Sequence, residues 1–389
     1  MIAPEPFFQP RGTPFSEYYR IRCLGELGHH VDLVTYPIGE NVEVPGLRIF
    51  RTRRVPGIRE VAIGPSWPKL PLDALLFGAA WRRLAAGGYD LIHSHEEAGI
   101  MGVFLSRFYR LPHIYDMHSS LPHQLETFGF TRSRLVRAAF DWMETTTVNG
   151  ADAVIAICPA LVRVAKRINP RARVTLIENT AESHAVDGVP PTQREELRRR
   201  LGLADRKVVL YTGTFEAYQG LELLLEAAAI IAGRRSDAVL VLVGGRPRQV
   251  EQRKLEAEKL GAAGICRFTG QVPHADVPPY LKLADALVSP RSRGENTPLK
   301  IYSYLRAGAP IVATDLPTHT QVLGSDVALL APPEPEPFAA AIERALDEPG
   351  LGERLSANAL RLSEAEYSYG RYVEKTRRLY EEVRTPAHG

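Results

Sequence analysis

Short apolar, β-branched runs alternate with helix-length stretches along most of the chain. In the first half these runs lie at 31–36, 91–93, 113–115, 153–157 and 174–177. After a polar, proline-containing stretch, the alternation resumes at 208–211, 239–243, 265–268, 286–288 and 311–313. Strands that alternate with helices are typical of βαβ units, which build parallel sheets covered by helices. The pattern therefore predicts an α/β protein with two doubly wound, parallel-sheet domains.

The polar stretch at 181–193 and the last helical segment set the predicted domain boundaries. We predict an N-terminal domain over 1–185, a C-terminal domain over 186–365, and a C-terminal helix over 366–389 that packs back on the N-terminal domain. A length of 389 residues suits two domains, because single cores rarely grow beyond about 250–300 residues. In the last segment, an apolar stripe at helical spacing predicts a packing face formed by Tyr369, Tyr372, Val373, Thr376 and Tyr380.

Composition and charge indicate a soluble globular chain. Hydrophobic residues make up 45% and charged residues 24%, and 48 Lys and Arg against 45 Asp and Glu leave a net charge of +3. This balance excludes a disordered chain and gives no support to a nucleic-acid-binding protein. Three cysteines without CxxC spacing predict neither a disulfide framework nor a cysteine zinc site, and they favour a cytoplasmic location. No long apolar run or signal peptide is visible. Only Met1, Ile2 and Ala3 precede Pro4, which indicates an upstream start or a clipped first strand.

In open α/β sheets, ligands bind beyond the carboxyl ends of the strands. In the N-terminal domain, Gly12 lies in a turn at 9–14, before a helix expected to begin around Phe15. Free amides at such a helix start favour an anion, although an ordinary turn is an equally good interpretation. His118 follows the strand at 113–115 and could donate a hydrogen bond or act as an acid or base. His93 and His95 occupy a comparable strand end, but local spacing supplies no third metal ligand.

Two loops of the C-terminal domain are candidate phosphate sites. The loop at 213–220 has a glycine at each end and leads into a helix, but it lacks the Lys-Ser/Thr of a P-loop. The segment at 289–300 places Arg291, Arg293 and Lys300 around a helix start. Thr297 is expected to cap this helix, Pro298 to fill its first turn, and Gly308 to lie near its end. The helix start and its cations predict a diphosphate site.

At this segment a family resemblance becomes specific. The stretch SPRSRGENTPLKIYSYLRAGAPIVATDLP resembles the signature region of the retaining nucleotide-sugar glycosyltransferases of family four. Further matching pieces follow in family order along nearly the whole chain: RGTPFSEYYRIRCLGELGHHVDLVT, YDLIHSHEEAG, YDMHSSLP, ADAVIAICPAL, YTGTFEAYQGLELLLEA, VLVGG and CRFTGQVP. The resemblance implies the GT-B fold, with two Rossmann-like domains facing a central cleft.

The resemblance also implies roles for individual residues. His118 and Glu295 match the family's catalytic positions and would contact the transferred sugar. The residues implied for the donor diphosphate are Gly12, Gly213, Thr214, Gln219, Arg291, Arg293, Thr297, Leu299 and Lys300. Those implied for the nucleoside are Arg246, Phe268, Gln271, Val272 and Ser303.

Three positions depart from the family pattern. Ser303 stands where the family has its second glutamate, which holds the ribose hydroxyls. Thr214 and Gln219 stand where the family has a phosphate-binding arginine and lysine. A charge-assisted hydrogen bond contributes about 1.5–3 kcal/mol, so the loss of two cations should weaken donor binding. Our hypothesis is that the missing charge comes from another cation, and the candidates are Arg291, Arg293, Arg246 and Lys300.

The implied reaction is transfer of a sugar, with retention of configuration, from a UDP-sugar or GDP-sugar to an acceptor hydroxyl. No cofactor or metal is expected beyond this donor, since no DxD-type acidic pair follows a strand end. The family's proposed route is front-face attack within an ion pair. The acceptor is undefined: a small molecule, a saccharide of the cell envelope, or a lipid-linked molecule.

The three departures keep alternatives open. One is a non-catalytic protein that binds sugar nucleotides or serves as a scaffold, and another is a sugar-nucleotide epimerase. A GT-B phosphorylase is disfavoured because no pyridoxal-type lysine signature is visible.

A peripheral membrane contact is one interpretation of the stretches at 51–59 and 63–83. The first is rich in arginine, and the second mixes apolar and basic residues, so together they could meet an anionic bilayer at its inner face. A charged loop followed by an ordinary amphipathic packing helix is the interpretation that the sequence favours.

Overall fold

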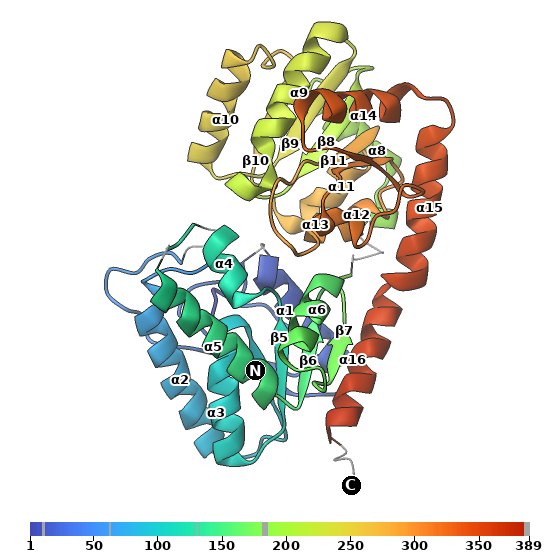
Figure 1. The fold of residues 1–389 in the computed structure, drawn as a ribbon. Coiled ribbons are helices and arrows are strands. Elements are labelled where there is room, and N and C mark those ends of the chain that lie inside the picture. Colours follow the sequence, from blue (N-terminus) through green and yellow to red (C-terminus); the bar gives the residue numbers. More distant parts are fainter. Residues whose placement is uncertain (10–11, 62–63, 128, 132, 181–185, 385–389) are drawn as a thin grey trace. The chain divides into compact units, whose positions relative to one another are not determined.

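The computed structural model describes residues 1–9, 12–61, 64–127, 129–131, 133–180 and 186–384 (Figure 1). By its internal contacts the chain divides into two compact units. The N-terminal unit is Met1–Glu178 together with the chain from Tyr372 on, and the C-terminal unit is Asn179–Arg371. The predicted boundary at 185 lies outside the described residues.

The N-terminal unit is built on a seven-stranded sheet in which all pairs are parallel, in the order β3-β2-β1-β4-β5-β6-β7. Its strands are β1 (Ile2–Ala3), β2 (Val31–Thr35), β3 (Leu47–Arg51), β4 (Ile92–His95), β5 (His113–Met117), β6 (Ala153–Ala156) and β7 (Val174–Leu176). Its helices are α1 (Gly12–Glu26), α2 (Lys69–Ala85), α3 (Gly99–Tyr109), α4 (Leu121–Thr127), α5 (Arg134–Gly150), α6 (Pro159–Ile168) and α16 (Tyr369–Arg384), with a short 3-10 helix η1 (Glu96–Ala98).

Two helical layers cover the faces of this sheet. The strand order reverses at β1, so right-handed crossovers place α1 on one face and α2, α3, α5 and α6 on the other. Neighbours within the second layer pack in the order α2, α3, α5, α6, and Figure 1 shows α2, α3 and α5 side by side. The last helix, α16, packs on α1, where Arg20 of α1 hydrogen-bonds Thr376 of α16.

The C-terminal unit has a six-stranded sheet in the order β10-β9-β8-β11-β12-β13, again with parallel pairs. Its strands are β8 (Lys207–Thr212), β9 (Ala238–Val243), β10 (Cys266–Gly270), β11 (Ala286–Ser289), β12 (Ile311–Thr314) and β13 (Ala328–Ala331). Its helices are α8 (Pro191–Arg200), α9 (Leu221–Arg234), α10 (Pro247–Lys259), α11 (Val277–Leu281), α12 (Leu299–Tyr304), α13 (Pro317–Thr320), α14 (Pro335–Asp347) and α15 (Leu351–Glu366), with 3-10 helices η2 (Ala217–Gln219) and η3 (His274–Asp276).

The prediction of two doubly wound α/β domains is confirmed. Two strands were not predicted: β3, a half-buried edge strand whose apolar residues are interrupted by arginines, and β13. In the region of the predicted C-terminal helix over 366–389, α15 ends at Glu366 and α16 runs over Tyr369–Arg384. The packing stripe is confirmed for Tyr372, Thr376 and Tyr380, which are buried in the N-terminal unit.

Within the described ranges, we find no helix that combines the length and the apolar content needed to cross a bilayer.

Candidate functional site

The C-terminal unit presents two candidate loops at the reversal of its strand order. Strands β8 and β11 are neighbours, and the chain leaves them toward opposite edges of the sheet. Such a reversal opens a crevice at the carboxyl ends of the strands, where open α/β sheets bind ligands. The loop at 213–220 follows β8 and the segment at 290–298 follows β11. The structure thus brings the two predicted phosphate segments to one place.

Two positions in this crevice require glycine, because neighbouring atoms leave no room for a Cβ. Gly213 has φ +141°, and a Cβ there would lie 2.9 Å from Lys300 Nζ and 3.2 Å from the Tyr211 hydroxyl. Gly220 has φ +73°, and a Cβ there would lie 1.8 Å from the carbonyl oxygen of Pro290. The Ser292 amide also donates a hydrogen bond to the Tyr218 carbonyl, at 3.1 Å. The two loops are therefore joined through their backbones.

Replacing Gly220 with alanine should lower the free energy of unfolding by about 2–4 kcal/mol, because it adds left-handed strain to a backbone clash. Gly233→Ala is the matched control: Gly233 lies in α9 at an ordinary φ, with nothing within 4 Å of an added Cβ. It should be neutral or stabilising by up to about 1 kcal/mol. Urea unfolding of both variants compares them, and equal stability would contradict this account of the loop junction.

Lys300 lies at the centre of the joined loops. Its partly buried ammonium is 3.8 Å from the centre of the Tyr211 ring and donates a hydrogen bond to Gln219 Oε1 at 3.3 Å. No carboxylate among the described residues forms an ion pair with it. Desolvation, and then the Arg291 guanidinium, holds the pKa of Lys300 well below its ordinary value. An ammonium in this setting is a site for an anion, because a bound negative group would stabilise the charged form that desolvation disfavours.

The three predicted arginines differ in what they contact. Arg291 lies over the Tyr218 ring at 5.0 Å and donates to the Arg293 and Asn296 carbonyls, so it braces its own loop beside Lys300. The Arg293 side chain is exposed. Arg246 lies at the start of α10 and forms an ion pair with Glu216 at 3.2 Å, which neutralises much of its charge.

The predicted cap of α12 is wrong. This helix begins at Leu299, with Pro298 before it in an extended conformation, and ends at Tyr304 rather than near Gly308. Thr297 Oγ1 is buried, and no hydrogen-bond partner for it is found among the described residues. The chain reaches the helix through the extended Pro298, so Thr297 stands one residue too early to cap it.

The other predicted residues of the C-terminal unit lie around this crevice. Gly213 and Thr214 follow β8, and the Thr214 carbonyl accepts a hydrogen bond from the Tyr211 hydroxyl. Phe268 lies in β10 with its ring 6.4 Å from that of Phe215, and Gln271 and Val272 follow that strand. Glu295 precedes α12, and its carbonyl accepts from Gln321. Ser303 is partly buried within α12.

In the N-terminal unit, His118 follows β5 directly and is buried. Alternate residues of a strand share a face, so Asp116 and His118 lie on one side of β5, and His93 and His95 on one side of the neighbouring β4. His118 Nε2 is 3.1 Å from His95 Nδ1 and 3.3 Å from Asp116 Oδ1. His118 Nε2 therefore lies against both the Asp116 carboxylate and the His95 ring.

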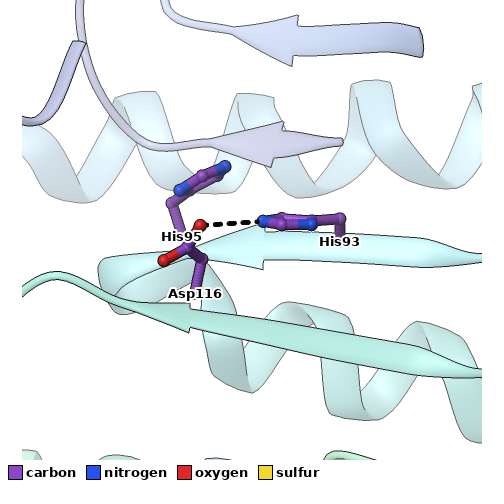
Figure 2. A group of neighbouring side chains, drawn as sticks. All are labelled: His93, His95 and Asp116. Carbon is purple, nitrogen blue, oxygen red and sulfur yellow. Dashed lines mark ion pairs between the residues drawn. The ribbon is translucent and has the colours of Figure 1, made fainter. Parts of the chain in front are cut away.

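Asp116 is the hub of this cluster (Figure 2). Its Oδ2 lies 3.2 Å from Arg20 Nε and 3.3 Å from His93 Nε2, while Oδ1 faces His118. Burial opposes its ionisation, but the Arg20 guanidinium and the nearby histidines outweigh burial and hold the pKa of Asp116 well below its ordinary value. The result is a buried Asp–Arg pair beneath His118.

Helix α16 completes the hub from the far end of the sequence. The Tyr380 hydroxyl hydrogen-bonds His93 Nδ1, and Arg20 Nη1 donates to Thr376 Oγ1 at 2.8 Å. Burial lowers the pKa of His93 to about 4 and moves the pKa of His118 below its ordinary value, so both rings are neutral near pH 7. The Asp–Arg pair is therefore surrounded by neutral groups from β4, β5 and α16.

His93, His95 and Asp116 also have the composition of a metal site, with ligand atoms within 4.8 Å of one another (Figure 2). However, a cation bound there would lie against the Arg20 guanidinium, which already engages the Asp116 carboxylate. Like charges at this distance in a buried site are strongly unfavourable. We therefore interpret the group as an ion-pair network that positions His118.

The predicted glycine turn differs from the structure. Helix α1 begins at Gly12 rather than near Phe15, and a Cβ on Gly12 would meet no atom within 4 Å. Close packing in this unit therefore does not require glycine there. The preceding residues of the turn, 10 and 11, lie outside the described residues.

The sequence interpretation missed Arg20 and Asp116. A signal for Asp116 was present, because aspartate and histidine alternate at the end of the strand at 113–117, beside the alternating histidines of 92–95. No local pattern indicates Arg20, which comes from a helix 96 residues before Asp116 in the chain.

Comparisons with known proteins agree with this architecture. Alpha-D-kanosaminyltransferase of Streptomyces kanamyceticus is 29% identical over 306 residues, which cover 75% of this chain and 77% of that protein. Sucrose-phosphate synthase from Thermosynechococcus elongatus has the same fold, with a TM-score of 0.80 and 23% identity over 96% of this chain and 93% of that chain. Anabaena HepE, solved in complex with UDP, gives a TM-score of 0.75 and 18% identity over 97% and 98% of the two chains. A further structure of HepE holds UDP-glucose.

Family models cover both units. Residues 20–180 match the "Glycosyl transferase 4-like domain", and residues 193–361 match "Glycosyl transferases group 1". Because the two matches together account for most of the sequence, in the order in which the two sheets occur, the chain belongs to the group 1 glycosyl transferases.

Proposed function

We propose that this glycosyltransferase moves a sugar from a nucleoside-diphosphate sugar to an acceptor hydroxyl, with retention of configuration and without a metal ion. The observation that carries the proposal is the ammonium of Lys300 at the strand reversal of the C-terminal unit, where no carboxylate from the described part of the chain forms an ion pair with it. A diphosphate is the group that this crevice suits best, because it brings a negative charge to Lys300, with which no carboxylate of the described residues pairs. The absence of a DxD-type pair at a strand end in the sequence supports the metal-free route.

Departure of the nucleoside diphosphate leaves negative charge on its terminal phosphate. Cations and backbone amides fixed in place before reaction stabilise such charge without reorganising. Lys300 and the loop amides after Gly213 and Gly220 fill this role in the proposal. In the N-terminal unit, His118 is the group that contacts the sugar, and its contacts with Asp116 and His95 hold its ring in place.

The contacts of Lys300 also bear on the departures from the family pattern. Gln219 stands where the family has lysine, and its amide oxygen accepts a hydrogen bond from Lys300 Nζ. The ammonium is thus located beside the position of the missing cation. Arg246 is a weaker candidate for this compensation because Glu216 already neutralises it. We therefore assign the compensating charge to Lys300, with Arg291 as its neighbour.

The donor in this proposal is a UDP-sugar or a GDP-sugar. HepE binds UDP and UDP-glucose in solved structures, which makes uridine nucleotides the first donors to test. The acceptor is a hydroxyl compound of unspecified class.

A thermal-shift panel of UDP, GDP, ADP and their sugars tests the proposal directly. One nucleoside diphosphate at 100 times its Kd should stabilise the fold by about 2.7 kcal/mol and raise the melting temperature by several degrees. The stabilising sugar nucleotide is then incubated with an acceptor panel and with no acceptor. Transfer, with the anomer read by NMR, supports the proposal. Donor conversion without an acceptor indicates an epimerase, binding without turnover indicates a non-catalytic protein, and no stabilisation by any nucleotide contradicts the proposed site.

A further inference from the structure

The outer surface of the helical layer α2–α3–α5–α6 is unusually apolar. On α5, Leu135, Ala138, Ala139 and Trp142 follow the spacing i, i+3, i+4, i+7 and are all exposed. Leu135 is 84% exposed and Trp142 is 61% exposed, although a stripe at this spacing normally faces a core. The stripe therefore faces outward, away from the described residues of its unit.

The same surface continues over α2 and α3. An aromatic group joins the two helices, with the Trp81 ring 4.5 Å from that of Phe108 and the Phe77 ring 5.7 Å from that of Phe104. Phe104 and Phe108 are both more than half exposed, and Trp67 and Leu70 extend the surface at the start of α2. Since α3 packs against both α2 and α5, the apolar residues of the three helices belong to one layer (Figure 1). Apolar patches of this kind mark interaction surfaces.

The exposed charges on this layer are mostly positive. Helices α2, α3, α5 and α6 are described throughout, and their exposed acid is Asp141. Their exposed cations are Arg82, Arg107, Arg134, Arg137, Arg163, Lys166 and Arg167. The other charged side chains of these helices are partly or fully buried: Lys69, Asp73, Arg83 and Glu144.

Helix α16, which packs on the opposite layer, shows that this excess of exposed cations is local to the α2–α3–α5–α6 layer. Two of its exposed arginines pair with acids of the same helix: Arg377 with Glu374 and Glu381, and Arg378 with Glu382. The net charge of only +3 for the whole chain agrees with such matching elsewhere.

From these observations we infer that the α2–α3–α5–α6 layer docks on an anionic lipid bilayer. Exposed tryptophan, phenylalanine and leucine can enter the interface between headgroups and acyl chains, while arginines contact lipid phosphates. Each cation near an anionic surface strengthens partitioning by about fivefold, and the effect weakens with salt. A second copy of the chain fits less well, because a face with seven exposed cations and one exposed acid would meet the same charge on its partner.

The double variant Leu135→Gln/Trp142→Gln tests the inference, with flotation on vesicles of equimolar phosphatidylcholine and phosphatidylglycerol. Its matched control is Leu255→Gln/Leu260→Gln, which removes two exposed leucines from the α10 region of the C-terminal unit. We expect the wild type and the control to float with the vesicles. The test variant should bind at least about tenfold more weakly. High salt, or vesicles of phosphatidylcholine alone, should release the wild type. Unchanged melting temperatures show that both variants remain folded.

Three results would overturn the inference: a wild type that stays unbound to the anionic vesicles, equal losses in the test and control variants, or binding that ignores lipid charge. Sedimentation velocity adds a further outcome. A dimer that the Leu135→Gln/Trp142→Gln variant dissociates, without any vesicle binding, would identify a second copy as the occupant. None of these readouts uses a donor or turnover, so they stand apart from the test of the proposed function.

Discussion

Replacing Lys300 with methionine should weaken the binding of the preferred nucleoside diphosphate by about 10- to 100-fold, because a charge-assisted hydrogen bond contributes about 1.5–3 kcal/mol. Isothermal titration calorimetry measures the loss. Methionine has nearly the length of lysine and can keep the contact with the Tyr211 ring, so the change removes the charge and leaves most of the packing.

The same substitution should leave the ligand-free protein as stable as the wild type or more stable. Desolvation lowers the pKa of Lys300 in the free protein, which means that folding disfavours its charged form. Removing that ammonium removes this cost. Binding and stability are therefore expected to change in opposite directions, which separates loss of a ligand contact from loss of fold.

The pH dependence of binding provides a further readout of Lys300. A bound diphosphate favours the ammonium and raises its pKa, so binding takes up protons wherever the free protein has lost them. Affinity in the wild type should fall as the pH rises above the lowered pKa of Lys300 in the free protein, and this dependence should be absent in Lys300→Met. Lys254→Met, an exposed lysine of α10 paired with Glu251, is the control and should bind as the wild type does. Wild-type affinity in Lys300→Met would remove Lys300 from the site.

The alternation of apolar runs and helices was enough to predict the two parallel sheets. Strands buried on both faces, such as β9 (Ala238–Val243), are continuous apolar runs that stand out in the sequence. The edge strand β3 was missed because Arg48 and Arg51 interrupt its apolar residues and the strand is only half-buried. The cap of α12 was misassigned because a threonine before a proline fits the local preference, whereas the path of the loop sets the actual helix start.

For a similar reason, the sequence predicted some residues of the candidate sites and missed others. Lys300 and the glycine loop follow strands, so the general position of ligand sites in open sheets pointed to them. The charge hub depends instead on contacts over long sequence separations: Arg20 is 96 residues from Asp116 and 356 residues from Thr376. No periodicity joins such residues. Only the folded chain shows that α1, β5 and α16 meet at one carboxylate.

That carboxylate should be among the most sensitive positions in the N-terminal unit. Asp116→Asn keeps the size of the side chain but leaves the buried Arg20 guanidinium without its counter-charge. Breaking a buried ion pair by removing one partner typically costs about 3–5 kcal/mol. We expect a loss of this size in the free energy of unfolding, measured in urea. Asp141→Asn, an exposed acid on α5, should change stability by less than about 0.5 kcal/mol.

The pH dependence of this stability contribution follows from the lowered pKa of Asp116. Because the folded pKa of Asp116 is well below its ordinary value, the unfolded chain binds its proton first as the pH falls. The contribution of Asp116 is therefore fully present above about pH 5 and is lost as the pH falls below about 4 toward the folded pKa. In Asp116→Asn this part of the acid dependence should disappear, so the stability gap between wild type and variant should narrow on acidification.

The double variant Arg20→Met/Asp116→Leu keeps the test decisive even where Asp116→Asn fails to fold. Removing both charges leaves no unpaired ion, and well-packed apolar replacements for a buried pair are often neutral or stabilising. The double variant should therefore be clearly more stable than Asp116→Asn, with a coupling between the two positions of about 1 kcal/mol or more. Additive losses at the two positions, or an Asp116→Asn variant as stable as the wild type, would show that the pair is not the hub of the unit. The hydrogen bond between the Tyr380 hydroxyl and His93 Nδ1 would then hold α16 in place without it.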